Sequence, residues 1–197
     1  MSGYWDWSGE DWVFDYVEGR RKNSDKNIRV EFNIAEGGTV RFHDDRKFGF
    51  LHYVSPEILA EKLSKLGPEV LLSENTYEPA KYLLGAGELG QIVDRKKPIK
   101  EILMNQDYIA GIGNIYAAEA LWMAKINPNR MGSDLSSKEV SSLFKACRDV
   151  VRRAVDRNLD YASLKIYRRK TCPTCEGIVS AEKIKARTTY WCTVCQH

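Results

Sequence analysis

Several features that would assign the chain to a special class are absent from its sequence. No apolar run approaches the roughly 20 residues that a membrane span needs, and nothing resembles a secretory signal. Internal repeats and low-complexity tracts are also absent. We therefore expect a soluble intracellular protein, located in the cytoplasm, the nucleoid or the nucleus. Its 197 residues, 43% hydrophobic and 29% charged, suit one large or two small globular domains.

Cysteine is scarce, and four of the five cysteines stand in two Cys-x2-Cys pairs near the C-terminus. Sixteen residues separate the pairs, a spacing typical of a zinc site with four thiolate ligands. The insert contains β-favouring and turn residues, so we predict a zinc-held β-hairpin. Two disulfides are the alternative, but the odd cysteine count and the missing signal favour a reducing compartment. The predicted zinc ligands are Cys172, Cys175, Cys192 and Cys195.

Positive charge is concentrated around these cysteines. Residues 162–197 contain seven lysines and arginines against two glutamates, a net charge of +5, whereas the whole chain carries only +3. A basic zinc-bound hairpin can neutralise nucleic-acid phosphates, with an affinity that falls steeply with salt. A solvated surface without a partner is the alternative explanation of this charge.

The N-terminal part of the sequence has a β pattern. Apolar residues alternate over 28–34 and again at 40 and 42, and Gly37-Gly38 between them offers a two-residue turn. This pattern predicts a hairpin with one buried face, and residues 48–54 predict a further strand. Ser55-Pro56 then predicts the start of a helix that ends before Gly67-Pro68.

The rest of the chain has a helical pattern. Residues 73–90 read as a connection around one short helix, and residues 98–158 read as helices. Ser136-x-x-Glu139 forms a capping box at the start of the longest helix, and Cys147 on its apolar face is predicted to be a buried thiol. We predict an α+β fold with a β-rich domain over 1–72, a helical domain over 73–160 and a zinc finger over 161–197.

Residues 98–121 are the second informative segment. A short helix leads into a turn with Gly111 and Gly113, and Asn114 is predicted to cap a second helix. The N-terminal amide groups and dipole of that helix would form an anion site suited to phosphate. A tight turn without a ligand is the alternative, and the presence of a basic zinc finger in the same chain favours the phosphate site.

These segments resemble a known family. IKEILMNQDYIAGIGNIYAAEAL, residues 99–121, resembles the helix-two-turn-helix of the formamidopyrimidine-DNA glycosylase and endonuclease VIII family, and CPTC…ARTTYWCTVCQ resembles that family's zinc finger. DDRKFGF at 44–50, LGPEVL at 66–71 and MSG at 1–3 are similar to further family segments, in the same order. The resemblance implies a base-excision repair protein, a DNA glycosylase and AP lyase, that binds damaged double-stranded DNA.

The resemblance also implies roles for individual residues. Lys100 and Asn114 would hold phosphates that flank the lesion, Arg187 would hold the same backbone, and Lys47 would contact a further phosphate. A lesion wedge would fill the gap left by a flipped nucleotide, since inserted side chains offset the few kcal/mol lost on unstacking. The implied wedge residues are Met1, Arg46 and Phe48; a core Phe48 and a solvated Arg46 are the alternative.

The sequence also departs from the family pattern. The N-terminal proline amine that serves as the family's nucleophile, the glutamate after it and a later hairpin lysine have no counterpart that we identify here. The 156–166 connection is also short for the family's lesion-capping loop, so the resemblance does not imply specificity for purine lesions. We expect a damaged-DNA-binding protein with little or no catalysis. The alternatives are an active glycosylase and AP lyase whose catalytic segment is supplied separately, and a non-catalytic nucleic-acid-binding component of a larger assembly.

Overall fold

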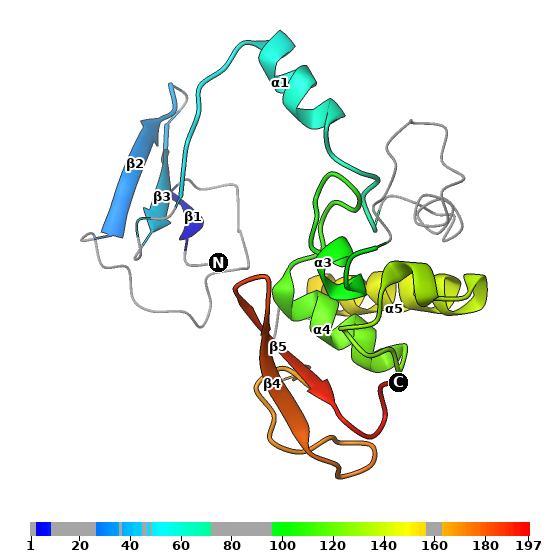
Figure 1. Ribbon diagram of the computed structural model, residues 1–197. Coiled ribbons are helices and arrows are strands. Elements are labelled where there is room, and N and C mark those ends of the chain that lie inside the picture. The colour runs from blue at the N-terminus through cyan, green and yellow to red at the C-terminus, as the bar shows by residue number, and fades with distance from the viewer. Residues whose placement is uncertain are drawn as a thin grey trace. The chain divides into compact units, whose positions relative to one another are not determined.

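The computed structural model describes residues 3–8, 27–35, 37–44, 47, 49–71, 96–156 and 163–197. The chain divides into two compact units, Met1–Ser55 and Pro56–His197 (Figure 1). The first unit is a small antiparallel sheet, and the second combines helices with a separate hairpin, so the predicted α+β fold is confirmed. No helix in these described ranges is long and apolar enough to cross a membrane.

The sheet of the first unit has three strands in the order β1-β3-β2, and all its neighbours are antiparallel. The strands are β1 (Gly3–Ser8), β2 (Ile28–Asn33) and β3 (Thr39–Asp44). Gly37 and Gly38 have positive φ angles of 96° and 107°, which glycine adopts without a side-chain clash, so the predicted β2–β3 hairpin is confirmed. Its apolar face is less covered than predicted, because Phe32 and Ile34 are exposed.

The predicted strand over 48–54 is wrong for the residues that the structure describes. Residues 49–55 have no regular secondary structure, and none of the strands described above pairs with them. A strand needs a neighbour for its backbone N–H and C=O groups, and an apolar sequence alone does not supply one. Phe50 and Tyr53 are accordingly exposed.

The second unit begins with α1 (Pro56–Ser64), which ends before Gly67-Pro68 as predicted. Gly67 lies against the backbone of Tyr108 and Ile109, so closely that a Cβ atom there would be 2.7 Å from the Ile109 nitrogen. The Gly67 amide also donates to the carbonyl of Gln106 at 2.9 Å. Gly67 is therefore packed against residues 106–109, which connect two of the helices described next.

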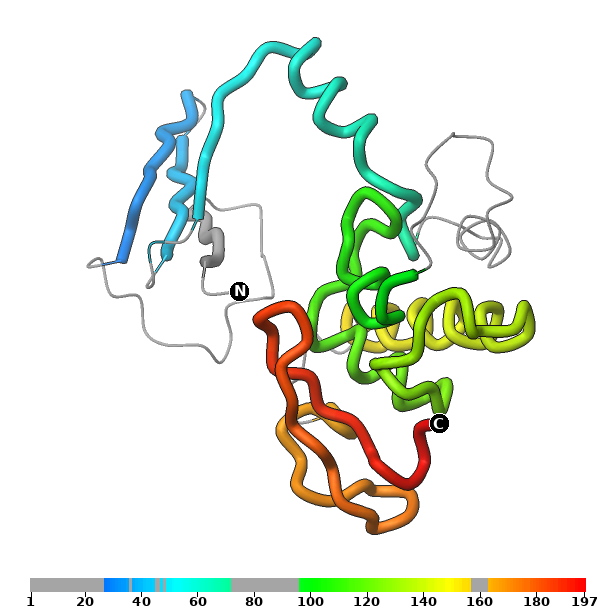
Figure 2. The backbone as a smooth tube through the Cα atoms, in the orientation of Figure 1, coloured from blue at the N-terminus to red at the C-terminus, as the bar shows by residue number. Residues whose placement is uncertain are grey.

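Three helices form the main core of this unit (Figure 2). They are α3 (Ile99–Leu103), α4 (Asn114–Met123) and α5 (Ser137–Asp156), with a short 3-10 turn, η2 (Gly132–Asp134), before α5. The capping box of α5 is confirmed, because Glu139 N donates to Ser136 Oγ and Ser136 N donates to Glu139 Oε2. Cys147 is fully buried in the core, as predicted, and burial raises the pKa of its thiol to about 12.

The predicted C-terminal β-hairpin consists of β4 (Val179–Ile184) and β5 (Arg187–Cys192). Lys185 and Ala186 form its two-residue turn, both with positive φ, the geometry that matches the twist of paired strands. A second core cluster joins the hairpin to α4 through Ala118, Ile166, Cys172, Val179 and Cys192. Helix α4 therefore packs against α5 and also against β5.

Candidate nucleic-acid interface and metal site

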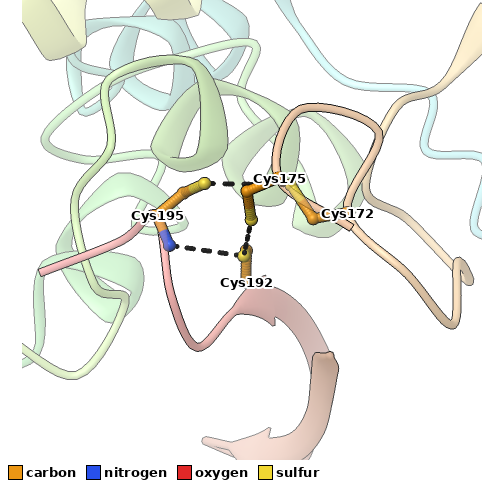
Figure 3. A group of neighbouring side chains, drawn as sticks. All are labelled: Cys172, Cys175, Cys192 and Cys195. Atoms are coloured by element: carbon orange, nitrogen blue, oxygen red, sulfur yellow. Dashed lines mark hydrogen bonds between the residues drawn. The ribbon is translucent and has the colours of Figure 1, made fainter. Parts of the chain in front are cut away.

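The four predicted metal ligands lie together at the base of the hairpin (Figure 3). Their sulfur atoms are all within 4.8 Å of one another. Cys172 and Cys195 are 4.0 Å apart at sulfur, and Cys175 and Cys192 are 3.5 Å apart. Tetrahedral ligands at the usual zinc–sulfur bond length lie about 3.8 Å apart, whereas a disulfide needs about 2 Å. The separations fit four thiolates around one metal ion and do not fit two disulfides.

Hydrogen-bond donors surround this sulfur cluster. Trp122 Nε1 on α4 donates to Cys172 Sγ at 3.4 Å, and the Cys195 amide donates to Cys192 Sγ at 3.3 Å. Burial raises the pKa of Cys172, but the donors, Trp122 first among them, outweigh burial and lower that pKa to about 6. The cluster can therefore supply an ionised ligand, which is the form that binds a metal.

The predicted turn with Gly111 and Gly113 lies directly before α4, with one correction to the prediction for Asn114. Gly111 has a φ of 92°, and Gly113 occupies the cap position. Asn114 is the first residue inside the helix, so the prediction that its side chain caps α4 is wrong. The first intrahelical bond runs from Ala117 N to Gly113 O, so the amide groups before Ala117 point out of the helix N-terminus.

Asn114 instead connects the helix to the hairpin. Its Nδ2 donates to the carbonyl oxygen of Thr188 at 3.0 Å, so the N-terminus of α4 lies beside the residue next to Arg187 in the chain. Arg187 itself is exposed at the start of β5. The structure therefore brings together two residues that are 73 positions apart in the sequence and that the family resemblance assigned to one task.

Lys100 on α3 lies in the interior of the second unit, beneath the N-terminus of α4. Its side chain is fully buried, and Nζ donates to the backbone carbonyl of Asn114 at 2.8 Å. Burial lowers the pKa of Lys100 to about 7. Lys100 therefore contacts the backbone from which Asn114 projects, and its ammonium group is not on the surface.

Lys47 belongs to the first unit, where Asp44 organises its loop. The Lys47 amide donates to Asp44 Oδ1 at 3.2 Å, and the Gly49 amide donates to Asp44 Oδ2 at 2.6 Å. Lys47 has a φ of 58° and is exposed. The implied wedge residues Met1, Arg46 and Phe48 lie outside the described residues.

Sequence reasoning missed the residues that attach the hairpin to the helices. Glu119 on α4 accepts three backbone hydrogen bonds from residues 165–167, and Trp122 donates to Cys172. At the hairpin turn, Lys185 pairs with Glu101 at 2.9 Å. One signal was present in the sequence: Glu119 is the only charged residue of an otherwise apolar helix, and such a residue is rarely buried without partners.

Comparisons with known proteins place this arrangement in a family. Residues 66–165 match the formamidopyrimidine-DNA glycosylase H2TH domain. The chain is 31% identical to the formamidopyrimidine-DNA glycosylase of Rickettsia felis and 32% identical to that of Aliivibrio fischeri. These matches cover 87% and 88% of this chain but 66% and 67% of the two relatives, so the chain spans about two thirds of their length.

A solved structure agrees with these matches. The formamidopyrimidine-DNA glycosylase of Lactococcus lactis, bound non-covalently to DNA containing an AP site, superposes with a TM-score of 0.77 at 25% identity. That comparison covers 100% of this chain and 71% of the Lactococcus chain. The helix pair, the cysteine cluster and these matches together show that the chain belongs to the formamidopyrimidine-DNA glycosylase family of DNA repair proteins.

Proposed function

We propose that this chain binds double-stranded DNA, with a preference for damaged or abasic sites, and that Asn114 and Arg187 hold one stretch of its backbone. The observation that carries the proposal is the hydrogen bond between Asn114 Nδ2 and the Thr188 carbonyl, which joins the α4 N-terminus to the strand of Arg187. A helix N-terminus attracts phosphate through its amide groups and dipole, and an exposed arginine beside it adds a bidentate donor.

The other residues predicted to contact DNA, Lys100 and Lys47 among them, have different roles in this proposal. The burial of Lys100 and its bond to the Asn114 carbonyl favour an indirect role, in which Lys100 supports the α4 N-terminus from below. Lys47 is exposed and its loop is held by Asp44, which suits a direct phosphate contact. We assign the lesion wedge to Met1, Arg46 and Phe48, on the family resemblance alone.

Zinc is the metal that we propose for the cysteine cluster. Four sulfur ligands with near-tetrahedral separations form a closed shell with no position for water or substrate, which is the pattern of a structural zinc site. When bound, zinc would stabilise the hairpin and hold β5 in place. The cluster would thus have a structural role, at the base of the strand that carries Arg187.

Replacing Arg187 with alanine tests the DNA-binding proposal. We expect Arg187→Ala to weaken binding to every duplex to a similar degree and to reduce the salt slope by about one, as the loss of one phosphate contact does. Lys170→Ala is a matched control, because Lys170 is exposed and basic but precedes the cysteine cluster, away from the hairpin turn. Unchanged affinity and salt dependence in Arg187→Ala would exclude the hairpin as a DNA-binding element.

A second candidate function follows from the family membership of the chain. About a third of the length of the relatives named as glycosylases is not matched by this chain. An active glycosylase and AP lyase would result if a separate polypeptide supplied the matching segment. We would then expect oxidised bases to be released when the catalytic segment of a relative is present, which an assay of base release with and without that segment measures.

A further inference from the structure

Glu119 is a buried carboxylate that the proposed function leaves without a role. It is only 4% exposed, on the side of α4 that faces the zinc finger. Its Oε2 accepts a hydrogen bond from the Lys165 amide at 2.8 Å, and its Oε1 accepts from the amides of Ile166 and Tyr167 at 2.9 Å each. One side chain therefore binds three consecutive backbone N–H groups across more than 40 residues of sequence.

These hydrogen bonds replace a secondary-structure partner. Residues 165–167 lie between α5 and β4 and belong to no helix or strand, so their amides have no ladder to join. Burying an unpaired carboxylate or an unpaired amide is costly, whereas charge-assisted hydrogen bonds between them satisfy both. The arrangement defines where the chain enters the zinc finger, because Ile166 in the middle of the segment is fully buried.

The segment held by Glu119 also supports the hairpin. Tyr167 packs edge-on against Tyr190 of β5, with ring centroids 5.1 Å apart. Trp122 lies three residues after Glu119, on the same side of α4, and donates to Cys172. Helix α4 therefore holds the finger by its entry segment and by a cysteine, while Asn114 at the start of α4 holds β5 near Arg187.

We propose that Glu119 is a positioning residue that docks the zinc finger on α4 and thereby sets the distance between Arg187 and the α4 N-terminus. Its effect on DNA binding rests on the proposed function, but its effect on docking does not. Glu119 would not contact DNA, because it is buried under the 165–167 segment. Its contribution passes through the backbone that it holds.

The Glu119→Gln variant separates this role from an effect of charge. Removing one negative charge would by itself strengthen binding to DNA. Glutamine also puts an NH2 group where a carboxylate oxygen now accepts, so at least one amide of 165–167 loses its partner. We expect one zinc per chain as in the wild type, DNA affinity lower by about tenfold, and a salt slope lower by about one.

Glu176→Gln is the matched control, because Glu176 is an exposed glutamate in the finger and the charge change is the same. It should bind DNA at least as tightly as the wild type. If Glu119→Gln kept its zinc and also bound DNA as tightly as the wild type or more tightly, the positioning role would be excluded.

A double-mutant cycle with Arg187→Ala tests the route of the effect. If Glu119 acts by placing Arg187, Glu119→Gln should cause little further loss once Arg187 is already alanine. Fully additive losses in the double variant would contradict the proposal, since they would show that Glu119 acts independently of Arg187. General destabilisation would also produce additive losses, so the cycle distinguishes positioning from a purely structural role.

Hydrogen exchange of the wild-type protein tests docking without any variant or DNA. The amides of residues 165–167 should exchange as slowly as those of the neighbouring core, although they belong to no helix or strand. Fast exchange at all three would overturn the proposal. If the wild type bound no DNA, the proposed function would fail, and this measurement would still decide whether Glu119 docks the finger.

Discussion

Lys100 places an ammonium group in the interior of the helical unit, and its burial makes stability depend on pH. Its pKa is about 7 in the folded protein against 10.5 for an ordinary lysine. Between these values the unfolded chain binds a proton that the folded protein does not, so the free energy of unfolding rises with pH. The destabilisation from burying this charge is fully present below pH 7 and is lost above about pH 10.5.

The Lys100→Met variant tests this pH dependence. Methionine keeps much of the side-chain volume but does not titrate, so the stability of the wild type relative to the variant should rise from pH 7 to 10. The slope should be at most about 1.4 kcal/mol per pH unit. Urea unfolding of both proteins at several pH values measures it. A difference that stayed constant over this range would show that Lys100 is not buried as a titrating group.

Single residues differ in how far the sequence reveals their role. The cysteine spacing and the Ser136–Glu139 capping box depend on local chain geometry, so they could be predicted, and the structure confirms the sulfur cluster and the box. Asn114 was assigned to the wrong helix position because its partner, the Thr188 carbonyl, is distant in sequence. Glu119 was missed for the same reason: its three partners lie in an irregular segment without a motif.

At the scale of elements, the β4–β5 hairpin depends on the rest of the unit for its stability. An isolated two-stranded hairpin is at best marginally stable in water. Its two ends carry the cysteine pairs, and one face packs on α4 through a small cluster. The order of the hairpin should therefore depend on the proposed metal, whereas the core of α3, α4 and α5 should not, since Lys100, Cys147 and their apolar neighbours need no ligand.

Metal removal tests this division of the second unit. We expect one zinc per chain, lost in Cys175→Ser or with a strong chelator, and fast amide exchange in residues 179–192 after the loss. The amides of α5 should remain protected. Elemental analysis of the undenatured protein measures the zinc. Protein without metal, in which all four thiols react freely, would contradict the zinc site.

The strands show what a sequence pattern can and cannot predict. Alternation with a glycine turn correctly predicted β2 and β3, because that pattern contains both strands and their connection. Residues 49–54 have a similarly apolar sequence but no described neighbour, so they do not form a strand. The hairpin at 179–192 was predicted because the cysteine pairs fix both of its ends. The strands whose partner lies next to them in sequence were therefore predicted correctly, whereas an apolar segment without such a partner was wrongly predicted to be a strand.

At the scale of the whole molecule, DNA binding and catalysis have to be considered separately. The relatives are named as glycosylases, but the segment that the resemblance assigns to the Schiff-base amine has no counterpart in these 197 residues. The α4 N-terminus and the strand of Arg187, for which we propose phosphate binding, lie together within Pro56–His197. We therefore expect these residues to bind DNA, and we treat the release of oxidised bases as a separate measurement.

An abasic duplex separates these two abilities. No base has to be unpaired at an abasic site, so the cost of opening the helix is lowest there, and the wedge assigned to Met1, Arg46 and Phe48 could fill the gap. We expect tighter binding to abasic duplex than to intact duplex, measured at several salt concentrations, and no release of oxidised bases. Any lyase activity would require an amine that forms a Schiff base with the abasic site.

Trapping with borohydride on the abasic duplex reports such an amine directly, because it reduces a Schiff base to a stable covalent link. We expect a small trapped fraction that forms slowly, because we identify no match to the family's nucleophile in this sequence, and a positioned acid–base group is worth about 10²–10⁴ in rate. Rapid and complete trapping, or efficient release of an oxidised base, would show that the chain holds a nucleophile among its own residues and is an enzyme by itself.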